Sequence, residues 1–326
     1  MPISSILSLA QSQDGTIWLG TDGAGLMSYN GYNFQEHHSN QVENNHHISS
    51  IIADKNDLFF TSQYKGLYTF SNNSFKQILA STAKTGDFLK IIKTDTTLLI
   101  IASKGIFRVQ ESKLIQIHSF KNSGKQLIIT NIISLKNGCV ILSSLGNFHY
   151  SHKNSKLIPL STWLNLPLSK TDFIKFGFVQ GNEILLYDGT MSKELKVILT
   201  DQDELFKLDL NAPISSLSFG QEIIALYGNR LNKKSAFITS TNEIFHSTKK
   251  FYTQIAHNYE YPLEVCKDII IDRNGDFWIS SSYKGLYKIS LEPFTKVVLS
   301  PVYNSSYINC IFKSQGGEIL ISTMEE

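Results

Sequence analysis

Of the chain's 326 residues, 42% are hydrophobic and 18% are charged, and the formal net charge is +2. This composition is typical of a globular protein with a sizeable core and argues against extended disorder. Arginine is rare, and Arg108, Arg230 and Arg273 are too few for base recognition, so no nucleic-acid partner is expected.

Neither a membrane contact nor an export signal is expected from this segment. No apolar run reaches the length of a membrane span, and the start, "MPISSILSLA", lacks the basic residues and long apolar run of a signal peptide. If the natural protein is exported, this chain is a mature segment or a fragment. Cys139, Cys266 and Cys310 lack metal-type spacing, and the first two lie in apolar strand patterns that predict small buried hydrophobes.

The first forty or so residues consist of short strand-like runs separated by turn sequences. "SILSLAQ", "TIWLGT", "LMSYN" and "NFQEHH" are divided by "SQDG", "DGAG" and "NGY". Runs of β-prone residues between Gly, Asn and Asp turns are typical of β-hairpins. The next unit contains "DLFFTSQYKGLYTF", and a near-copy, "DFWISSSYKGLYKI", follows far along the chain. The chain is therefore built from repeats.

Aligning the repeats on the glycine of "KGLY" places a bulky apolar residue seven positions earlier in each copy. Four strands in roughly forty residues, repeated along the chain, predict an all-β β-propeller, since no helical stretches lie between the strands. The apolar position holds Trp18, Phe59, Leu98, Cys139 and Trp278, with less clear copies at Leu185, Ile224 and Leu320; the glycines are Gly25, Gly66, Gly105, Gly146 and Gly285.

We expect seven four-stranded sheets, or blades, over residues 1–300, with an eight-bladed ring as the alternative. Residues 301–326 are expected to form a closure segment or the truncated start of a further repeat. The five aligned glycines are expected to take a positive φ in the hairpin between the second and third strands. Phosphate binding by "GTDGAG" is not favoured, because a strand and not a helix follows it.

The unit "ILSLAQSQDGTIWLGTDGAGLMSYN" resembles the two-component-regulator propeller repeat, whose pattern runs through D-x-x-G, W-I-G-T and a G-G-L hairpin. Asp268–Ser290, "DIIIDRNGDFWISSSYKGLYKIS", is a second match, whereas the central copies are eroded, with Leu98 and Cys139 in place of the tryptophan and little motif left around "EILLYDG" and "EIIALYG".

The resemblance implies a sensor domain on the extracytoplasmic or periplasmic side of a membrane-bound signalling protein. In that family, propellers commonly occur as a pair of seven-bladed rings followed by an immunoglobulin-like module, which would be this chain's neighbours. Some members bind breakdown products of polysaccharides, so an oligosaccharide or another small ligand is implied. The kinase or other output domain of such proteins is not in this sequence.

Propeller geometry places the hairpins between second and third strands on the same face as the connections between blades. An aromatic ring beside an ammonium group suits stacking on a sugar and bonding to its hydroxyl or carboxylate groups. The alternative is that these side chains only cover solvated turns. The candidate ligand-binding residues are Tyr64, Lys65, Tyr283, Lys284, Asp22, Gln63 and Ser282.

The segment His37–His47, "HHSNQVENNHH", carries four of the nine histidines. An Asn-rich connection offers no fixed geometry or supporting partners for a metal, so a solvated, mobile loop is favoured. Neither a metal nor another cofactor is expected.

Enzymatic activity is not favoured. A sialidase would need clustered arginines and a different turn spacing from "SQDGTIW". Streptogramin lyase, a rival seven-bladed propeller, would need a histidine near the ring centre, but His118, His149 and His246 lie in outer segments. Paired carboxylates from different blades would be invisible in sequence. The two remaining hypotheses are a ligand sensor and a scaffold propeller that binds a protein through one face.

Overall fold

The computed structural model describes residues 5–37, 47–55, 57–94, 97–120, 126–135, 137–180, 183–188, 194–199, 205–209, 223–229, 234–239, 244–247, 252–256, 266–290, 308–313 and 319–323. The chain divides into two compact units, Met1–Leu291 and Glu292–Glu326. Within the described residues, the secondary structure is β-strand apart from α1 (Leu160–Leu164) and the 3₁₀ helix η1 (Leu168–Lys170).

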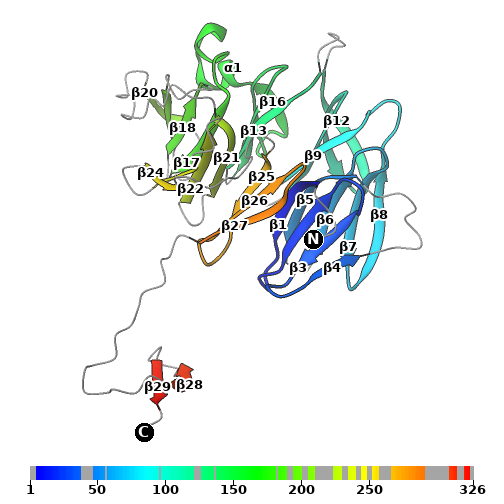
Figure 1. The fold of residues 1–326 in the computed structure, drawn as a ribbon. Coiled ribbons are helices and arrows are strands. Elements are labelled where there is room, and N and C mark those ends of the chain that lie inside the picture. Colours follow the sequence, from blue (N-terminus) through cyan, green and yellow to red (C-terminus); the bar gives the residue numbers. More distant parts are fainter. Residues whose placement is uncertain are drawn as a thin grey trace. The chain divides into compact units, whose positions relative to one another are not determined.

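The first four sheets are meanders in which each strand pairs antiparallel with the next (Figure 1). Short turns join the strands, as the hairpin pattern of the sequence predicts. Their strands are β1 (Ile6–Gln11), β2 (Ile17–Thr21), β3 (Leu26–Tyr29) and β4 (Phe34–His37); β5 (Ile48–Asp54), β6 (Asp57–Ser62), β7 (Gly66–Ser71) and β8 (Ser74–Ala80); β9 (Phe88–Lys93), β10 (Leu98–Ala102), β11 (Gly105–Gln110) and β12 (Lys113–Ser119); β13 (Ile129–Leu135), β14 (Gly138–Ser143), β15 (Phe148–Ser151) and β16 (Lys156–Pro159).

The remaining sheets of the first unit follow the same order. Two have four strands and the last has three. Their strands are β17 (Phe176–Gln180), β18 (Glu183–Tyr187), β19 (Glu194–Leu199) and β20 (Leu205–Asp209); β21 (Ile223–Asn229), β22 (Lys234–Thr239), β23 (Ile244–Ser247) and β24 (Tyr252–Ala256); β25 (Cys266–Ile271), β26 (Phe277–Ser281) and β27 (Gly285–Ile289).

The fold is an all-β propeller, but the structure shows six four-stranded blades, so the prediction of seven, with eight as the alternative, is wrong for the described residues. The seventh sheet has three described strands, and the segment 291–300 expected to supply its fourth lies outside the described residues. That segment contains Pro293, which cannot donate to a strand ladder. Ile224, expected in a second strand, lies in β21, the first strand of its sheet.

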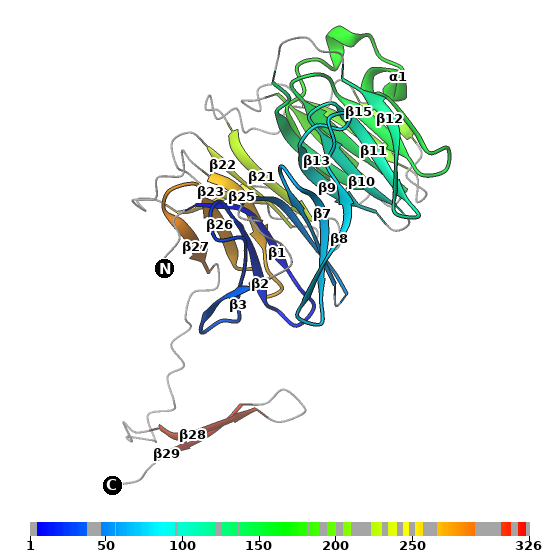
Figure 2. The same cartoon turned by 90° about the vertical axis from the view of Figure 1, so that its right-hand side faces the viewer.

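The three-stranded sheet β25–β27 joins the two ends of the series of blades. Figures 1 and 2 show it, in orange, between blue β1 and yellow-green β21, and β25 contacts both of these strands. Innermost strands of successive sheets also contact at β1–β5, β5–β9, β13–β17 and β17–β21. The first unit is therefore a ring of sheets with its closing seam between β25 and β1.

The core lies between neighbouring sheets, which explains the bulky residue of each second strand. Trp278 of β26 packs on Ile17, Leu19 and Met27 of the first blade, and Phe59 of β6 packs on the third blade. A strand buried on both faces reads as a continuous apolar run, and every residue of β14 is buried. The sheets are therefore held together by interdigitated apolar side chains.

The aligned glycines need two different explanations. Gly25, Gly66, Gly146 and Gly285 have positive φ values of 69°, 133°, 131° and 82°, as predicted. Gly105 is not among the positive-φ residues, so its predicted conformation is wrong. A Cβ atom on Gly105 would collide with the carbonyl oxygen of His118, so close approach of the outermost strand excludes a side chain there.

The second unit contains β28 (Ile308–Lys313) and β29 (Ile319–Thr323), which pair antiparallel. Their register shifts between Ile308 and Cys310, just as the register of β1 and β2 shifts between Ile6 and Ser8. The pair thus has the geometry of the first two strands of a blade. Both expectations for residues 301–326, a closure segment or the start of a repeat, stay predictions.

Candidate functional site

One face of the ring carries the hairpins between second and third strands together with the starts of the innermost strands. Asp22 forms an isolated bridge with His47, the residue before β5. The backbone N–H of Gln63 donates to the His47 carbonyl at 3.2 Å, and that of Phe88 donates to Gln63 at 3.1 Å. We call this surface, defined by Asp22, His47, Gln63–Lys65 and Ser282–Lys284, the hairpin face.

Tyr64 stands at the tip of the second blade's hairpin, and its side chain is 63% exposed. Its carbonyl accepts a hydrogen bond of 2.8 Å from the Ser81 hydroxyl, and the next carbonyl, of Lys65, accepts one of 2.9 Å from the Gln77 amide. Its ring centroid lies 5.9 Å from that of His47. The backbone under Tyr64 is therefore fixed while most of the ring faces solvent.

Tyr283 holds the matching place in the three-stranded sheet and is 70% exposed. The Ser281 hydroxyl accepts the backbone N–H groups of Tyr283 and Lys284, each at 3.2 Å. The Ser282 hydroxyl oxygen is buried and has no hydrogen-bond partner among the described residues. This hairpin is thus also fixed from below, with one polar atom left unsatisfied.

Sequence reasoning missed His47 as part of this face. Its Nδ1 lies 2.9 Å from an Asp22 carboxylate oxygen, and its ring meets Tyr64, so it joins the hairpins of the first two blades. The available signal was its position directly before an innermost strand, where the chain returns to this face. No ring contact or hydrogen bond between described residues joins Tyr64 to Tyr283, whose sheets flank the first blade on either side.

The innermost strands carry a polar residue at one repeated position, directly after the register shift. The Asp268 carboxylate accepts the backbone N–H of Leu9 at 2.9 Å, and the Ser50 hydroxyl accepts that of Ile91 at 3.2 Å. Burial raises the pKa of Asp268, and the positive charge of Lys90 opposes this rise. Where the side chains of the innermost strand are described, this position holds Ser8, Ser50, Lys90, Asn131 and Asp268.

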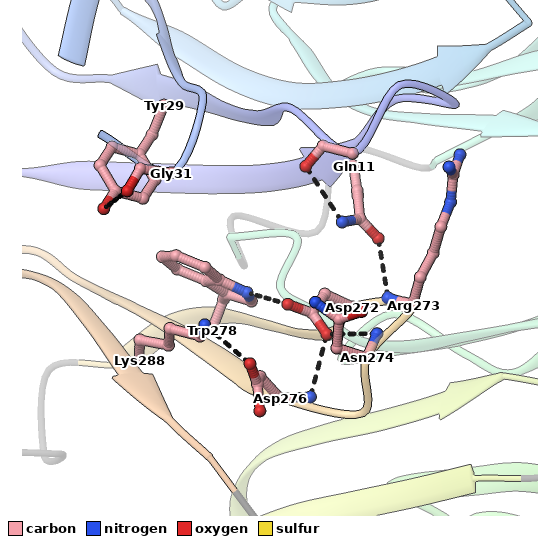
Figure 3. Close-up of polar contacts among 10 residues, drawn as sticks. Gln11, Tyr29, Gly31, Asp272, Arg273, Asn274, Asp276, Trp278 and Lys288 are labelled. Carbon is pink, nitrogen blue, oxygen red and sulfur yellow. Dashed lines mark hydrogen bonds and ion pairs between the residues drawn. The ribbon is translucent and has the colours of Figure 1, made fainter. Parts of the chain in front are cut away.

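At the closing seam the D-x-x-G turn fixes Trp278, the tryptophan at the repeated apolar position (Figure 3). The Asp272 carboxylate accepts the backbone N–H groups of Asn274 and Asp276 at 2.9 Å and the indole N–H of Trp278 at 2.8 Å. In the first blade Ser12 takes the place of the aspartate, and its hydroxyl accepts the Trp18 indole N–H at 3.0 Å. The motif is therefore structural at both sites.

The histidine-rich segment is described only at its two ends. His37 bonds the Ser28 hydroxyl at 2.8 Å and packs against Trp18, and His47 pairs with Asp22. The prediction of a solvated loop is therefore wrong for these two residues, while 38–46 lie outside the described part. Among the described residues, no group of three or more potential metal ligands is present.

The residues considered for catalysis lie apart. Arg273 is in the turn between β25 and β26, and Arg108 is on the third strand of its blade, as expected. His118 lies in the outermost strand β12, while His149 and His246 lie in the third strands β15 and β23. Burial lowers the pKa of His149 to about 4, so that imidazole is neutral at pH 7. None of these three histidines lies on an innermost strand.

The family model of the two component regulator propeller matches residues 1–23. This stretch contains β1, β2 and the turn that fixes Trp18, and the resemblance predicted from the sequence is confirmed. The fold is thus a β-propeller whose first repeat matches the two component regulator propeller model. No curated protein matches the chain, and no helix among the described residues is long and apolar enough to cross a membrane.

Solved structures of the same fold come from signalling proteins and from an enzyme. The extracellular domain of a B. thetaiotaomicron protein, described as a one component or hybrid two component system, aligns with a TM-score of 0.61 at 17% identity, over 98% of this chain and 43% of that chain. A second such domain from that organism has a TM-score of 0.60 at 13% identity, over 99% and 45%. This chain thus spans less than half the length of these relatives.

Virginiamycin B lyase from Staphylococcus aureus is the enzyme, with a TM-score of 0.60 at 10% identity, over 89% of this chain and 96% of that chain. A propeller solved with a bound peptide, YCF48 with a D1 peptide, has a TM-score of 0.59 at 12% identity, over 91% and 96%. At such identities these likenesses establish the fold alone.

Proposed function

We propose that this chain is the extracytoplasmic ligand-sensing propeller of a two-component-type signalling protein, that its hairpin face binds an oligosaccharide, and that it has no catalytic activity of its own. The observation that carries the proposal is the pair of exposed tyrosines, Tyr64 and Tyr283, on backbone held by hydrogen bonds. The similar domains of B. thetaiotaomicron signalling proteins, which are extracellular, support the location and the role.

The chemistry of the hairpin face suits a sugar. A tyrosine ring offers an apolar face to the C–H groups of a pyranose and a hydroxyl for hydrogen bonding. Lys65, Lys284 and the Asp22–His47 pair supply donors and an acceptor for hydroxyl or carboxylate groups. Because the hairpin backbones are already fixed, binding loses little conformational entropy.

The absence of catalysis is proposed from the placement of the histidines. A propeller lyase needs a base that reaches a substrate, but His149 is buried and neutral, and His118 has a pKa lowered by burial on an outermost strand. The likeness to virginiamycin B lyase therefore extends to the fold, and we carry no residue role over from it.

Signalling requires that the ligand favour one arrangement of this propeller with its neighbours over another. We propose a neighbouring propeller and an immunoglobulin-like module of the same protein as those partners. The signalling relatives are more than twice as long as this chain, which leaves room for such modules.

A second candidate function is protein binding through the same face. Ile128, which is 56% exposed, directly precedes β13. Leu168, which is 65% exposed, lies in the connection between β16 and β17, and Asn147 of the fourth blade's hairpin forms a hydrogen bond with that connection. Both lie on the side of the ring that carries Tyr64. Exposed apolar residues around one face favour a broad partner over a small ligand.

The test is a thermal-shift screen of the purified chain against oligosaccharides from plant, algal and animal glycans. We expect one glycan class to raise the melting temperature saturably, because a ligand that binds only the folded state stabilises it. Tyr64→Ala and Tyr283→Ala should abolish the shift. Tyr32→Ala is the matched control, since Tyr32 is 89% exposed in the turn between β3 and β4, away from the hairpin face.

A shift that survives both hairpin variants, or that the control also loses, would overturn the proposed site. The absence of any shift across the panel would favour the protein-binding function. In that case Ile128→Ser and Leu168→Ser should weaken capture of the neighbouring module as much as the tyrosine variants do.

A further inference from the structure

A groove of about 310 Å³ opens between the first and second blades, on the face opposite the hairpins. Its apolar wall consists of Trp18, Leu58 and Phe70, and its rim carries charged and amide side chains from the neighbouring turns. None of these residues belongs to the proposed sugar site. The groove is therefore a separate feature of the ring.

The indole of Trp18 is the aromatic surface of this groove. His37 and Phe70 pack against it at centroid distances of 4.9 and 5.5 Å, and its N–H is taken up by Ser12. The side chain is nevertheless only half-buried. Part of an indole face, with its polar atom already satisfied, is left for stacking with a planar or cationic group.

The rim is rich in polar groups that lack partners. Lys55, Asp57, Asn72 and Asn73 make no side-chain hydrogen bond or ion pair within the part of the chain that the structure describes. Asp14 accepts hydrogen bonds from Ser12 and Thr16, which lower the pKa of its carboxyl and keep it ionised. Two carboxylates, one of them unpaired, thus lie beside the indole.

The closing seam, between the sheet β25–β27 and the first blade, contains the place equivalent to this groove, and there it is filled by side chains (Figure 3). There Trp278 meets Tyr29 at 5.7 Å and 59°, nearly the same geometry as Trp18 with Phe70, at 5.5 Å and 59°. The ammonium of Lys288 lies 5.3 Å from the indole centroid and 2.7 Å from an Asp276 oxygen.

A guanidinium completes that seam. The side chain of Arg273 crosses to the first blade and donates to the Ser12 carbonyl at 2.9 Å. Arg273 is the second residue of its turn, and Gln13 is the second residue of the turn at the groove. Gln13 is shorter and makes no side-chain hydrogen bond among the described residues, and Ser28 replaces Lys288. The groove therefore lacks both cations that its counterpart supplies.

We propose that this groove is a docking site for an arginine side chain presented by an extended segment of another protein. The guanidinium would stack on Trp18 and donate to Asp57 and Asp14, in planar pairs that a guanidinium forms with carboxylates. Lys55 and the carboxamides of Asn72 and Asn73 would bond the backbone carbonyls on either side. This gives a partner to each of the four unpaired side chains Lys55, Asp57, Asn72 and Asn73.

The experiment is calorimetric titration of the whole chain with acetyl-Gly-Arg-Gly-amide and with the same peptide carrying citrulline, which is uncharged but nearly identical in shape. We expect the arginine peptide to bind with a Kd on the order of 1 mM and the citrulline peptide at least roughly tenfold more weakly. Added salt should weaken binding of the arginine peptide, because part of its affinity comes from charge attraction, which salt screens.

Three variants localise the binding. Asp57→Asn should weaken it about fivefold or more, whereas Asp172→Asn, the same change at an exposed carboxylate elsewhere, should leave it unchanged. Gln13→Arg supplies a guanidinium from the chain itself and should prevent binding of the arginine peptide. Equal binding of both peptides, no binding, or full binding by Asp57→Asn or Gln13→Arg would each overturn the proposal. Tyr64→Ala should have no effect, which separates this site from the sugar site.

Discussion

At the scale of single residues, the two repeat tryptophans differ in how far the next sheet covers them. Trp278 is 6% exposed and packs among residues of the first blade, whereas Trp18 is half-buried because it lines the groove. Removal of a buried aromatic side chain loses its transfer free energy and leaves a cavity. The same repeat position therefore contributes different amounts of stability at different seams.

Trp278→Ala should lower the free energy of unfolding by about 3–5 kcal/mol, and Trp18→Ala by roughly half as much. The measurement is urea denaturation of both variants and the parent chain at pH 7, followed by far-ultraviolet circular dichroism. Equal losses, or a near-neutral Trp278→Ala, would contradict the packing described for the closing seam.

Residue types could be predicted from the sequence wherever one local rule decides them. Gly25, Gly66, Gly146 and Gly285 were predictable, because a hairpin that needs a positive φ selects glycine. Gly105 was not, because its glycine is required by the neighbouring β12 carbonyl, a contact that no local pattern shows. The place of His47 in the candidate site was not predicted for the same reason, because its partners Asp22 and Tyr64 come from two different hairpins.

At the scale of elements, α1 and η1 are the departures from a purely β structure within the described residues, and α1 packs on the fourth blade. Its Trp163 stacks on His149 of β15, with ring centroids 4.0 Å apart and an interplanar angle of 5°. The Nδ1 atom of His149 is buried and has no hydrogen-bond partner in the part of the chain that the structure describes. A five-residue helix gives too short a periodic pattern to be recognised from sequence.

This contact should make the fold sensitive to acid. Burial lowers the pKa of His149 to about 4, so the unfolded chain binds the proton first as the pH falls below 6.5, and stability falls until the pH reaches 4. His149→Phe keeps an aromatic ring stacked on Trp163 but cannot be protonated. Between pH 6.5 and pH 4 its free energy of unfolding should therefore fall by about 3 kcal/mol less than that of the parent chain. Parallel pH-dependent denaturation curves for the two proteins would show that His149 is not the buried group responsible.

At the scale of the whole molecule, the repeat period predicted the propeller class, since four strands per unit admit few other folds. The number of complete blades was less predictable. Blades five and six retain little of the motif, and the last sheet shows only β25–β27 among the described residues. Ring closure depends on contacts between residues far apart in sequence, such as the hydrogen bond from the Leu9 backbone N–H to the Asp268 carboxylate, and repeat counting does not reveal them.

The last prediction concerns that closure. Innermost strands of neighbouring sheets share no strand ladder, so the hydrogen bond from the Leu9 N–H to the Asp268 carboxylate is a specific link across the seam. Its loss in Asp268→Leu leaves a buried N–H unpaired and should lower the free energy of unfolding by about 1–3 kcal/mol.

Asp268→Asn keeps an acceptor oxygen and removes the charge whose burial raises the pKa of this carboxyl. At pH 7 this variant should therefore be as stable as the parent chain or more stable. The gain from Asp268→Asn should shrink as the pH falls toward 4, because the native carboxyl then takes up its proton. Denaturation of both variants at pH 7 and pH 4 tests this; if Asp268→Asn is as unstable as Asp268→Leu at pH 7, the carboxylate charge itself closes the ring, through Lys90, and the hydrogen bond does not.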